Sequence, residues 1–342
     1  MIYEDLLDAS PGEQTDFVRQ VCEELEQNRR WLEEEALPRM TPSQRAAFDW
    51  VLHKRGDYCF ITGPGGTGKS FLLKAVMTML ELWQGAHVAV LASTGTAAHL
   101  IGGQTVHRFF RLQTDLGSRL QYGTDEWATV THTDVLIIDE VSMMSCHLLE
   151  AIDRECRRCA LRVHQERPFG AKRLILFGDL YQLPPVLRTG DDAPIYAHRL
   201  WPLFQVLHLQ ESCRQQGDAP FFDLLNRLRV GALEKKDWEL LQSRVCGTGH
   251  ALSPACRPWL SGTPGAVLVA CHKQKDSINA RRLETLSSKL VVLPALDTDA
   301  QGHDLSSEEQ EQLRRVQDRL PDVCTLKVHA LCLLFAFLKH NT

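Results

Sequence analysis

The sequence predicts an α/β fold built on a parallel sheet with crossover helices. Three observations carry this prediction. Short apolar runs of strand length recur from about residue 58 to residue 209, separated by helical segments or polar loops. A glycine-rich phosphate-binding motif directly follows the first of these runs. With 44% hydrophobic and 24% charged residues in 342, the composition is that of a globular protein with about two domains.

The predicted strands and helices follow these runs in order along the chain. The expected strands are Tyr58–Thr62, Val88–Leu91, Val135–Ile138, Leu174–Phe177, Val206–Leu209 and, in a second region that begins near Glu211, Ala266–Cys271. The expected helices are Phe71–Met79, Phe221–Val230 and Trp238–Leu241. The stretch from Gly102 to Thr133 is polar and irregular, so we expect an insertion there, at about residues 105–130.

Charge is distributed unevenly along the chain. Residues 1–40 hold eleven acidic and four basic side chains, so they carry −7 against a net charge of −5, and the rest carries +2. Apolar and acidic positions alternate there with a helical period that ends at Pro38, which predicts an acidic helical preface. Arg154, Arg158 and Arg162 recur every four residues on one helical face, which either approaches phosphates or is solvated.

Simple counts exclude several protein classes. The longest apolar run, Ala330–Leu338, has nine residues, whereas a membrane-spanning helix needs about 20. The first ten residues contain acidic side chains and no cationic segment before an apolar stretch, so neither a secretory signal nor an Arg-rich transit peptide is predicted. Eleven cysteines without regular spacing are expected to be reduced thiols. The C-x-x-C from Cys156 to Cys159 is either part of a zinc site, with Cys146 or His164, or two small side chains on a helix.

The strongest local signal is a phosphate-binding loop of the form G-x-x-x-x-G-K-S. Glycines let the backbone turn tightly and aim N–H groups at phosphate oxygens, and the following helix offers its positive N-terminal end. Lys69 is expected to reach the β- and γ-phosphates and Ser70 to bind Mg²⁺. The residues predicted to bind the nucleotide here are Gly63, Pro64, Gly65, Gly66, Thr67, Gly68, Lys69 and Ser70.

Two adjacent carboxylates follow the third predicted strand. Asp139 is expected to hold Mg²⁺ near the γ-phosphate. Glu140 points elsewhere because the chain is leaving the strand, so it is expected to orient and deprotonate the attacking water. A nucleotide hydrolase is therefore predicted, and an acidic strand end that faces solvent is the alternative. A signalling GTPase is disfavoured because the chain has no guanine-reading N-K-x-D motif.

Further motifs, in a specific order, make the chain similar to a known family. They are Ser93-Thr-Gly-Thr-Ala-Ala98, Thr105-Val-His107-Arg-Phe109, Asp139-Glu-Val-Ser-Met143 and Gly178-Asp-Leu-Tyr-Gln182-Leu-Pro-Pro-Val186. From Thr41 to about Leu286 this order resembles the Pif-one (petite integration frequency) DNA helicases of superfamily one, alongside the RecD-like enzymes. The resemblance implies a P-loop RecA-like ATPase domain over residues 41–210 and a partial second RecA-like domain over 211–342.

The resemblance also assigns roles to single residues. Gln44 matches the adenine-reading Gln ahead of the phosphate loop, and Gln182 matches the residue that couples the γ-phosphate to bound DNA. Arg214 matches the first arginine that stabilises charge on the transferring phosphoryl group, with a surface salt bridge as the alternative. The implied catalytic set is thus Lys69, Asp139, Glu140, Gln182 and Arg214.

The same resemblance implies contacts with single-stranded DNA. Hydroxyls and backbone amides can hold phosphates while an aromatic ring stacks on a base, and Phe109 is either that ring or a core residue. The residues that match the family's DNA contacts are Thr94, Gly95, Thr105, His107 and Phe109.

The family activity implied is ATP- and Mg²⁺-dependent 5′ to 3′ translocation on single-stranded DNA, with unwinding of forked duplexes, in DNA repair, recombination and telomere maintenance. A monomer in the nucleus is expected rather than a mitochondrial protein, because the N-terminus is acidic. The family has a last motif with a second γ-phosphate arginine, for which this chain offers no candidate. A truncated, non-catalytic module that binds ATP and DNA is therefore the alternative.

Overall fold

The computed structural model describes residues 11–113, 115–186, 192–213, 219–245, 267–285, 290–294 and 323–327. The chain divides into two compact units, Met1–Asp237 and Trp238–Thr342. The domain boundaries expected from the sequence stay predictions.

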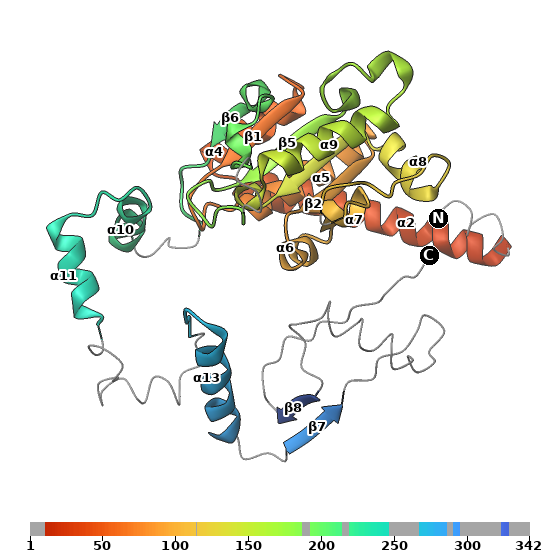
Figure 1. Cartoon of the computed structure of the whole chain (residues 1–342). Helices are drawn as coiled ribbons and strands as arrows, with labels where there is room; N and C mark the ends of the chain where they lie inside the picture. The colour runs from red at the N-terminus through yellow and green to blue at the C-terminus, as the bar shows by residue number, and fades with distance from the viewer. Residues whose placement is uncertain are drawn as a thin grey trace. The chain divides into compact units, whose positions relative to one another are not determined.

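The first unit is built on one parallel sheet with strand order β3-β2-β4-β5-β1-β6 (Figure 1). All five neighbouring pairs run parallel, which confirms the predicted α/β class. Five of the strands coincide with the predicted apolar runs. The six are β1 (Tyr58–Thr62), β2 (Val88–Ala92), β3 (Gln104–Thr105), β4 (Val135–Asp139), β5 (Arg173–Gly178) and β6 (Gln205–His208).

Helices cover both faces of this sheet (Figure 1). All three predicted helices are present, within α5, α10 and α11. The α-helices of the first unit are α2 (Pro11–Arg30), α3 (Leu37–Arg39), α4 (Pro42–Leu52), α5 (Lys69–Gln84), α6 (Gly95–Leu100), α7 (Val106–Phe109), α8 (Asp125–His132), α9 (Cys146–Cys159) and α10 (Ala219–Arg229). Helix α11 (Lys235–Ser243) crosses the boundary between the two units. Shorter turns of π or 3₁₀ helix are η1 (Trp31–Ala36), η2 (Val141–Met143), η3 (Arg162–His164), η4 (Pro168–Ala171), η5 (Ile195–Ala197) and η6 (Trp201–Leu203).

Each face of the sheet has its own hydrophobic core. Successive strand residues point to opposite faces, so Phe60 and Ile138 pack with α7, α8 and α9. Ile61 and Ile137 pack on the other face with α4, α5 and η1. Because both faces are covered, the central strands are apolar throughout, which is why they were recognisable in the sequence.

The predicted acidic preface is part of the second of these cores. Leu32 is fully buried, and the Trp31 ring meets Phe71 of α5 edge to face with centroids 6.1 Å apart. The Lys74 ammonium lies 4.3 Å from the Trp31 ring centroid. The exposed acidic side chains are Glu23, Glu24, Glu33, Glu34 and Glu35, and the helical segment ends at Arg39, one residue past the predicted end at Pro38.

The stretch predicted as an irregular insertion contributes to the sheet and the core. It begins with β3, which pairs with β2 at the sheet edge, and a strand of two residues leaves no apolar run for the sequence to reveal. Phe110 and Val130 from the same stretch are fully buried. The insertion is therefore integral to the first unit.

The second unit contains, among its described residues, α13 (His272–Thr285) and an antiparallel pair formed by β7 (Leu290–Pro294) and β8 (Val323–Lys327). The predicted strand at Ala266–Cys271 is wrong over its described part. Residues 267–271 have no strand conformation, and the Leu268 side chain is 95% exposed. Hydrophobic composition alone does not make a strand, because none of the described strands pairs with this segment.

Two arginines of the predicted basic face, Arg154 and Arg158, lie on α9 and are about half exposed but paired, whereas Arg162 lies past the helix end in η3 and is exposed. Arg154 and Arg158 both pair with the buried carboxylate of Glu155, at 3.0 and 2.9 Å. They also donate to the backbone oxygens of Leu116 and Leu120. These arginines therefore attach α9 to the segment before α8.

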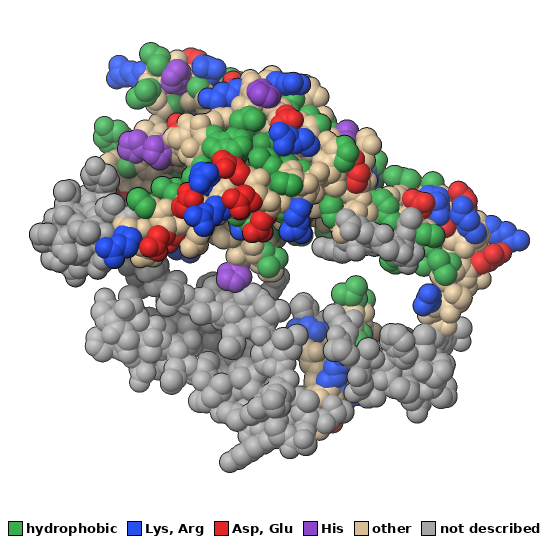
Figure 2. Space-filling model, turned by 180° about the vertical axis from the view of Figure 1, so that it is seen from behind, with side chains coloured by type: hydrophobic (Ala, Val, Ile, Leu, Met, Phe, Trp, Pro, Cys, Tyr) green, Lys and Arg blue, Asp and Glu red, His purple; other side chains and the backbone are tan. Residues whose placement is uncertain are grey.

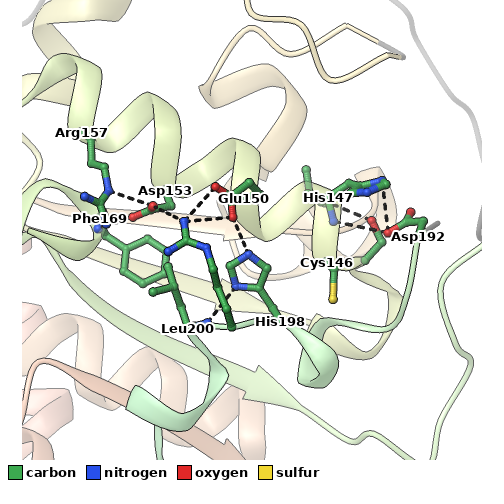
Figure 3. A network of polar contacts seen from close by, with 12 residues as sticks. Cys146, His147, Glu150, Asp153, Arg157, Phe169, Asp192, His198 and Leu200 are labelled. Atoms are coloured by element: carbon green, nitrogen blue, oxygen red, sulfur yellow. Dashed lines mark hydrogen bonds and ion pairs between the residues drawn. The ribbon is translucent and has the colours of Figure 1, made fainter. Parts of the chain in front are cut away.

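A second buried carboxylate holds the opposite side of α9 (Figure 3). Asp153, only 2% exposed, accepts the Phe169 backbone N–H at 2.6 Å and pairs with Arg157 at 2.8 Å. Nearby, Glu150 contacts His198 at 2.7 Å and Arg199 at 3.0 Å. The network fixes η4 and the chain before β6 against α9.

The two cysteines of the C-x-x-C motif are core residues of α9. Cys156 is fully buried and Cys159 nearly so, and burial raises the pKa of both thiols, that of Cys159 to about 11. No group of three or more metal-ligating side chains occurs among the described residues. The helix alternative is confirmed for these two cysteines.

We expect Asp153→Ala to destabilise the first unit by about 2–4 kcal/mol, because it leaves the buried Phe169 N–H without its acceptor and Arg157 without its partner. Urea denaturation measures this loss. The matched control is Glu26→Ala, which removes an exposed helix-surface carboxylate and should leave the denaturation midpoint unchanged. Equal midpoints for both variants would contradict the structural role of Asp153.

Candidate nucleotide and DNA site at the carboxyl edge of the sheet

The parallel register brings the ends of five neighbouring strands together along one edge. Ala92 pairs with Asp139 and Thr62 pairs with Gly178. The residues at or just past these strand ends, in spatial order, are Thr105 (β3), Ser93 (β2), Glu140 (β4), Asp179 (β5) and Gly63 (β1). The predicted DNA segments thus occupy one end of the row and the phosphate loop the other.

The loop between β1 and α5 has two positions at which a side chain would meet neighbouring atoms, and one of them also has a left-handed backbone. Gly68 lies in the left-handed region with φ of 75°, and a Cβ there would lie 2.4 Å from Nε2 of Gln44. A Cβ on Gly63 would lie 2.7 Å from the backbone oxygen of Leu209. Helix α5 begins at Lys69 with no side-chain cap, so its first N–H groups face the loop. This cradle fits a phosphate group.

Lys69 lies inside the loop. Its Nζ donates to the backbone oxygens of Gly63 at 2.8 Å and Pro64 at 3.2 Å. Burial lowers its pKa, and the carboxylates of Asp179 and Glu140 partly offset that effect. The cation is therefore held by oxygen atoms at the position where a phosphate would be bound.

Asp139 and Glu140 differ in environment, as predicted. Asp139 is 5% exposed, and burial, reinforced by the charge of Glu140, raises its pKa to about 6 although it accepts the Glu140 N–H at 2.9 Å. Glu140 is half-buried and leaves the strand in the left-handed region, with φ of 54°. A buried carboxylate with the Ser70 hydroxyl suits Mg²⁺, which keeps water and phosphate oxygens as its other ligands.

Gln44 lies against the phosphate loop, where the sequence placed it, but its amide is already hydrogen bonded. The side-chain oxygen accepts the Thr41 N–H at 3.0 Å and the nitrogen donates to the Thr67 backbone oxygen at 2.9 Å. The side chain is 1% exposed. Its adenine-reading role stays a prediction. That role requires the Gln44 amide to give up at least one of these two hydrogen bonds and to bond to the adenine instead.

The chain after β6 reaches back onto the same loop, a contact that sequence reasoning missed. Glu211 accepts from Thr41 Oγ1 at 2.9 Å and from Ser43 Oγ, and the Cys213 N–H donates to the Gly66 oxygen at 2.8 Å. Although burial opposes the shift, these hydroxyls lower the pKa of Glu211. Arg214 follows directly and lies outside the described residues.

Asp179 is a second missed residue, although it directly follows an apolar strand. It is 2% exposed, and Arg229 of α10 pairs with it at 2.6 Å while lying 4.4 Å from the Tyr181 ring centroid. Gln182 is exposed on the loop after β5, and its Nε2 lies 3.5 Å from Asp179. This places Gln182 beside the row of strand ends.

Two of the predicted DNA residues are helix N-caps. Thr94 Oγ1 accepts the Ala97 N–H and Thr105 Oγ1 accepts the Arg108 N–H, each at 3.2 Å. A hydroxyl that accepts such a bond keeps its proton to donate, for example to a phosphate. Gly95 is exposed beside Thr94.

His107 and Phe109 follow Thr105 in α7. His107 is half-buried and its contact with DNA stays a prediction. Phe109 is 5% exposed and packs edge to face on Phe110 with centroids 4.8 Å apart. Its predicted stacking on a base is corrected, because the packed core leaves no ring face for a nucleotide, and the core alternative is right.

The described surface does not gather charge of one sign on the face seen in Figure 2. Lys and Arg side chains alternate there with Asp and Glu. A nucleic acid bound on this face would therefore depend on local groups rather than on a broad basic field. Among the described residues, every helix is too short or too polar to cross a lipid bilayer.

Comparison with known proteins shows a consistent likeness. The family model of PIF1-like helicases matches residues 39–239. An ATP-dependent DNA helicase PIF1 of Candida albicans is 32% identical over 79% of this chain and 30% of its own length. The Bdellovibrio bacteriovorus Pif1 helicase is 30% identical over 77% of this chain and 57% of its own.

Solved structures have the same fold. A crystal structure of Pif1 helicase from Candida albicans has a TM-score of 0.68 at 31% identity, over 84% of this chain and 63% of that one. A Bacteroides Pif1 in complex with ADP-AlF3 and ssDNA has a TM-score of 0.57 at 24% identity, over 75% of this chain and 61% of that one, a likeness of fold alone. The chain spans about a quarter to a third of the length of the first curated relatives it matches.

Replacing Asp139 tests the buried carboxylate. A carboxyl whose pKa is about 6 in the folded protein, against about 4 when unfolded, destabilises the fold once it is ionised. Asp139→Asn should therefore stabilise the nucleotide-free protein at pH 8, on the order of 2 kcal/mol. The gain should shrink as the pH falls through 6 toward 4. Thermal melting at both pH values measures it, with the exposed Asp57→Asn as control; a loss of stability at pH 8 would contradict this account.

Proposed function

Because the chain belongs to the PIF1-like helicase family, we propose that it forms the ATP-driven motor of a DNA helicase, which moves 5′ to 3′ along single-stranded DNA and unwinds duplexes. The observation that carries this proposal is the row of strand ends. One rigid parallel sheet holds the phosphate loop, two adjacent carboxylates and the Thr94 and Thr105 hydroxyls along a single edge.

The residues of the row have complementary parts in hydrolysis. The N–H groups of the loop and of α5, with Lys69, hold the β- and γ-phosphates of ATP. Glu140 accepts the proton of the attacking water. Ser70 and Asp139 would hold Mg²⁺, which would neutralise charge on the phosphate oxygens. Arg214 is proposed to stabilise the transferring phosphoryl group.

DNA binding is proposed at the other end of the row. The hydroxyl protons of Thr94 and Thr105 and the exposed backbone at Gly95 can donate to phosphates without reading sequence. Gln182, beside Asp179, lies between this end and the phosphate loop. The nucleotide and ssDNA held by the Bacteroides protein of the same fold support this assignment.

The cellular setting is proposed from the family. A monomer acting on single-stranded and forked DNA in the nucleus would serve DNA repair, recombination and telomere maintenance. Imaging of the tagged chain tests the compartment, and a mitochondrial signal would contradict it.

The decisive measurement is steady-state ATP hydrolysis with and without single-stranded DNA. We expect DNA to stimulate hydrolysis and Glu140→Gln to lower kcat on the order of 10²- to 10⁴-fold while nucleotide binding persists, because the general base is lost. Lys69→Ala should weaken binding as well. Glu166→Gln, an exposed change in the loop before β5, is the matched control and should leave kcat unchanged.

Two outcomes would contradict parts of the proposal. ATP binding without hydrolysis would favour the alternative of a non-catalytic module that binds ATP and DNA. Hydrolysis without displacement of a duplex that carries a 5′ single-stranded tail, or displacement only with a 3′ tail, would refute unwinding or its direction.

A further inference from the structure

Ser93 connects two neighbouring positions in the row of strand ends by one hydrogen bond. Its Oγ donates to the backbone oxygen of Glu140 at 2.9 Å, across 47 residues of sequence. Ser93 is the first residue after β2, and Glu140 is the first after β4. Because β2 and β4 pair directly, with Ala92 opposite Asp139, the two residues leave the sheet side by side.

The two partners belong to segments with different proposed tasks. The residue after Ser93 is Thr94, whose hydroxyl caps α6 and is proposed to hold a DNA phosphate. Glu140 is the proposed general base. Bound DNA that moves the backbone at Thr94 would therefore act on the neighbouring residue, Ser93, which is hydrogen bonded to Glu140.

Glu140 has a conformation that depends on such support. Its φ of 54° and ψ of 44° place it in the left-handed region, which is unfavourable for a residue with a Cβ. On its amino side, the Glu140 N–H is bound by Asp139 Oδ1. On its carboxyl side, Val141 is confined by β5, since a Cβ on Gly178 would lie 2.9 Å from the Val141 side chain. The remaining backbone group, the Glu140 carbonyl, accepts the Ser93 hydroxyl at 2.9 Å and, from its own turn, the Met143 N–H at 3.3 Å, so Ser93 supplies its long-range bond.

We propose that Ser93 is a positioning residue that couples single-stranded DNA at Thr94 and Gly95 to the Glu140 carboxylate. DNA bound at the turn after β2 fixes the Ser93 hydroxyl, and this hydroxyl fixes the backbone from which the Glu140 side chain extends. The inference rests on the proposed function, since it names how DNA regulates that same site. In this role Ser93 acts through the Glu140 backbone and is assigned no contact with the nucleotide or the attacking water.

Substitution of Ser93 in the full chain tests the coupling. Ser93→Ala should lower the DNA-stimulated kcat by up to about 100-fold, the loss that follows displacement of a catalytic group by about 1 Å. The basal rate without DNA should change much less, and the Kd values for ATP and for an oligo-dT strand should stay within about twofold. Ser93→Thr, which keeps the hydroxyl, should restore most of the stimulation.

The control removes the same kind of bond elsewhere. Ser243 Oγ donates to the Leu240 backbone oxygen at 2.7 Å at the end of α11, and Ser243→Ala should leave stimulation unchanged. Full stimulation in Ser93→Ala would overturn the proposal. So would an equal loss with and without DNA, which indicates support of Glu140 without coupling, or a weakened Kd for oligo-dT, which indicates a direct DNA contact.

A second readout does not depend on hydrolysis. Hydrogen exchange of the amides at residues 139–143 should slow when oligo-dT binds the wild-type chain and should not respond in Ser93→Ala. This response in a chain that hydrolyses no ATP would support the coupling while the proposed catalytic function fails. An identical exchange response in both variants, or no response in the wild type, would overturn the coupling.

Discussion

The parallel register of the sheet is the constraint on which the site depends. Parallel strands put all their carboxyl ends on one edge, so each residue that leaves a strand meets the residues that leave its neighbours. Ala92 opposite Asp139 and Thr62 opposite Gly178 are enough to bring Ser93 beside Glu140 and the phosphate loop beside Asp179. The hydrogen bonds between paired strands are therefore sufficient to bring site residues from distant segments together.

Burying ionisable groups at this edge destabilises the fold and makes the groups responsive to ligands. Asp139 has a raised pKa and Lys69 a lowered one because both charges are desolvated. Phosphate oxygens and a divalent cation would replace the lost solvent at both groups. Lys69 meanwhile bonds to two loop carbonyls, and Gln44 bonds to Thr41 and Thr67. Nucleotide binding is therefore expected to exchange protein hydrogen bonds for ligand bonds.

The rest of the first unit keeps that edge rigid. Helix α9 packs along one face of the sheet and is held by two buried carboxylates. Asp153 pairs with Arg157 (Figure 3), and Glu155 pairs with Arg154 and Arg158. Buried ion pairs add little stability compared with apolar packing, but breaking one leaves an uncompensated charge. They therefore specify which segments lie against the helix, including the chain before β6.

Contiguous residues determined much of this protein. Five of the six strands predicted from apolar runs are present. The phosphate loop and Asp139-Glu140 could be predicted because a loop or a strand end is formed by residues that are neighbours in sequence. Only the tertiary structure decided what a side chain meets. Phe109 is buried in the core and Arg158 pairs with a buried carboxylate. The two-residue β3 pairs at the sheet edge, and Ser93 donates a hydrogen bond to Glu140. The physical reason is that the groups that bury a side chain or bond to it come from segments tens of residues apart, so the pattern of neighbouring residues does not predict them.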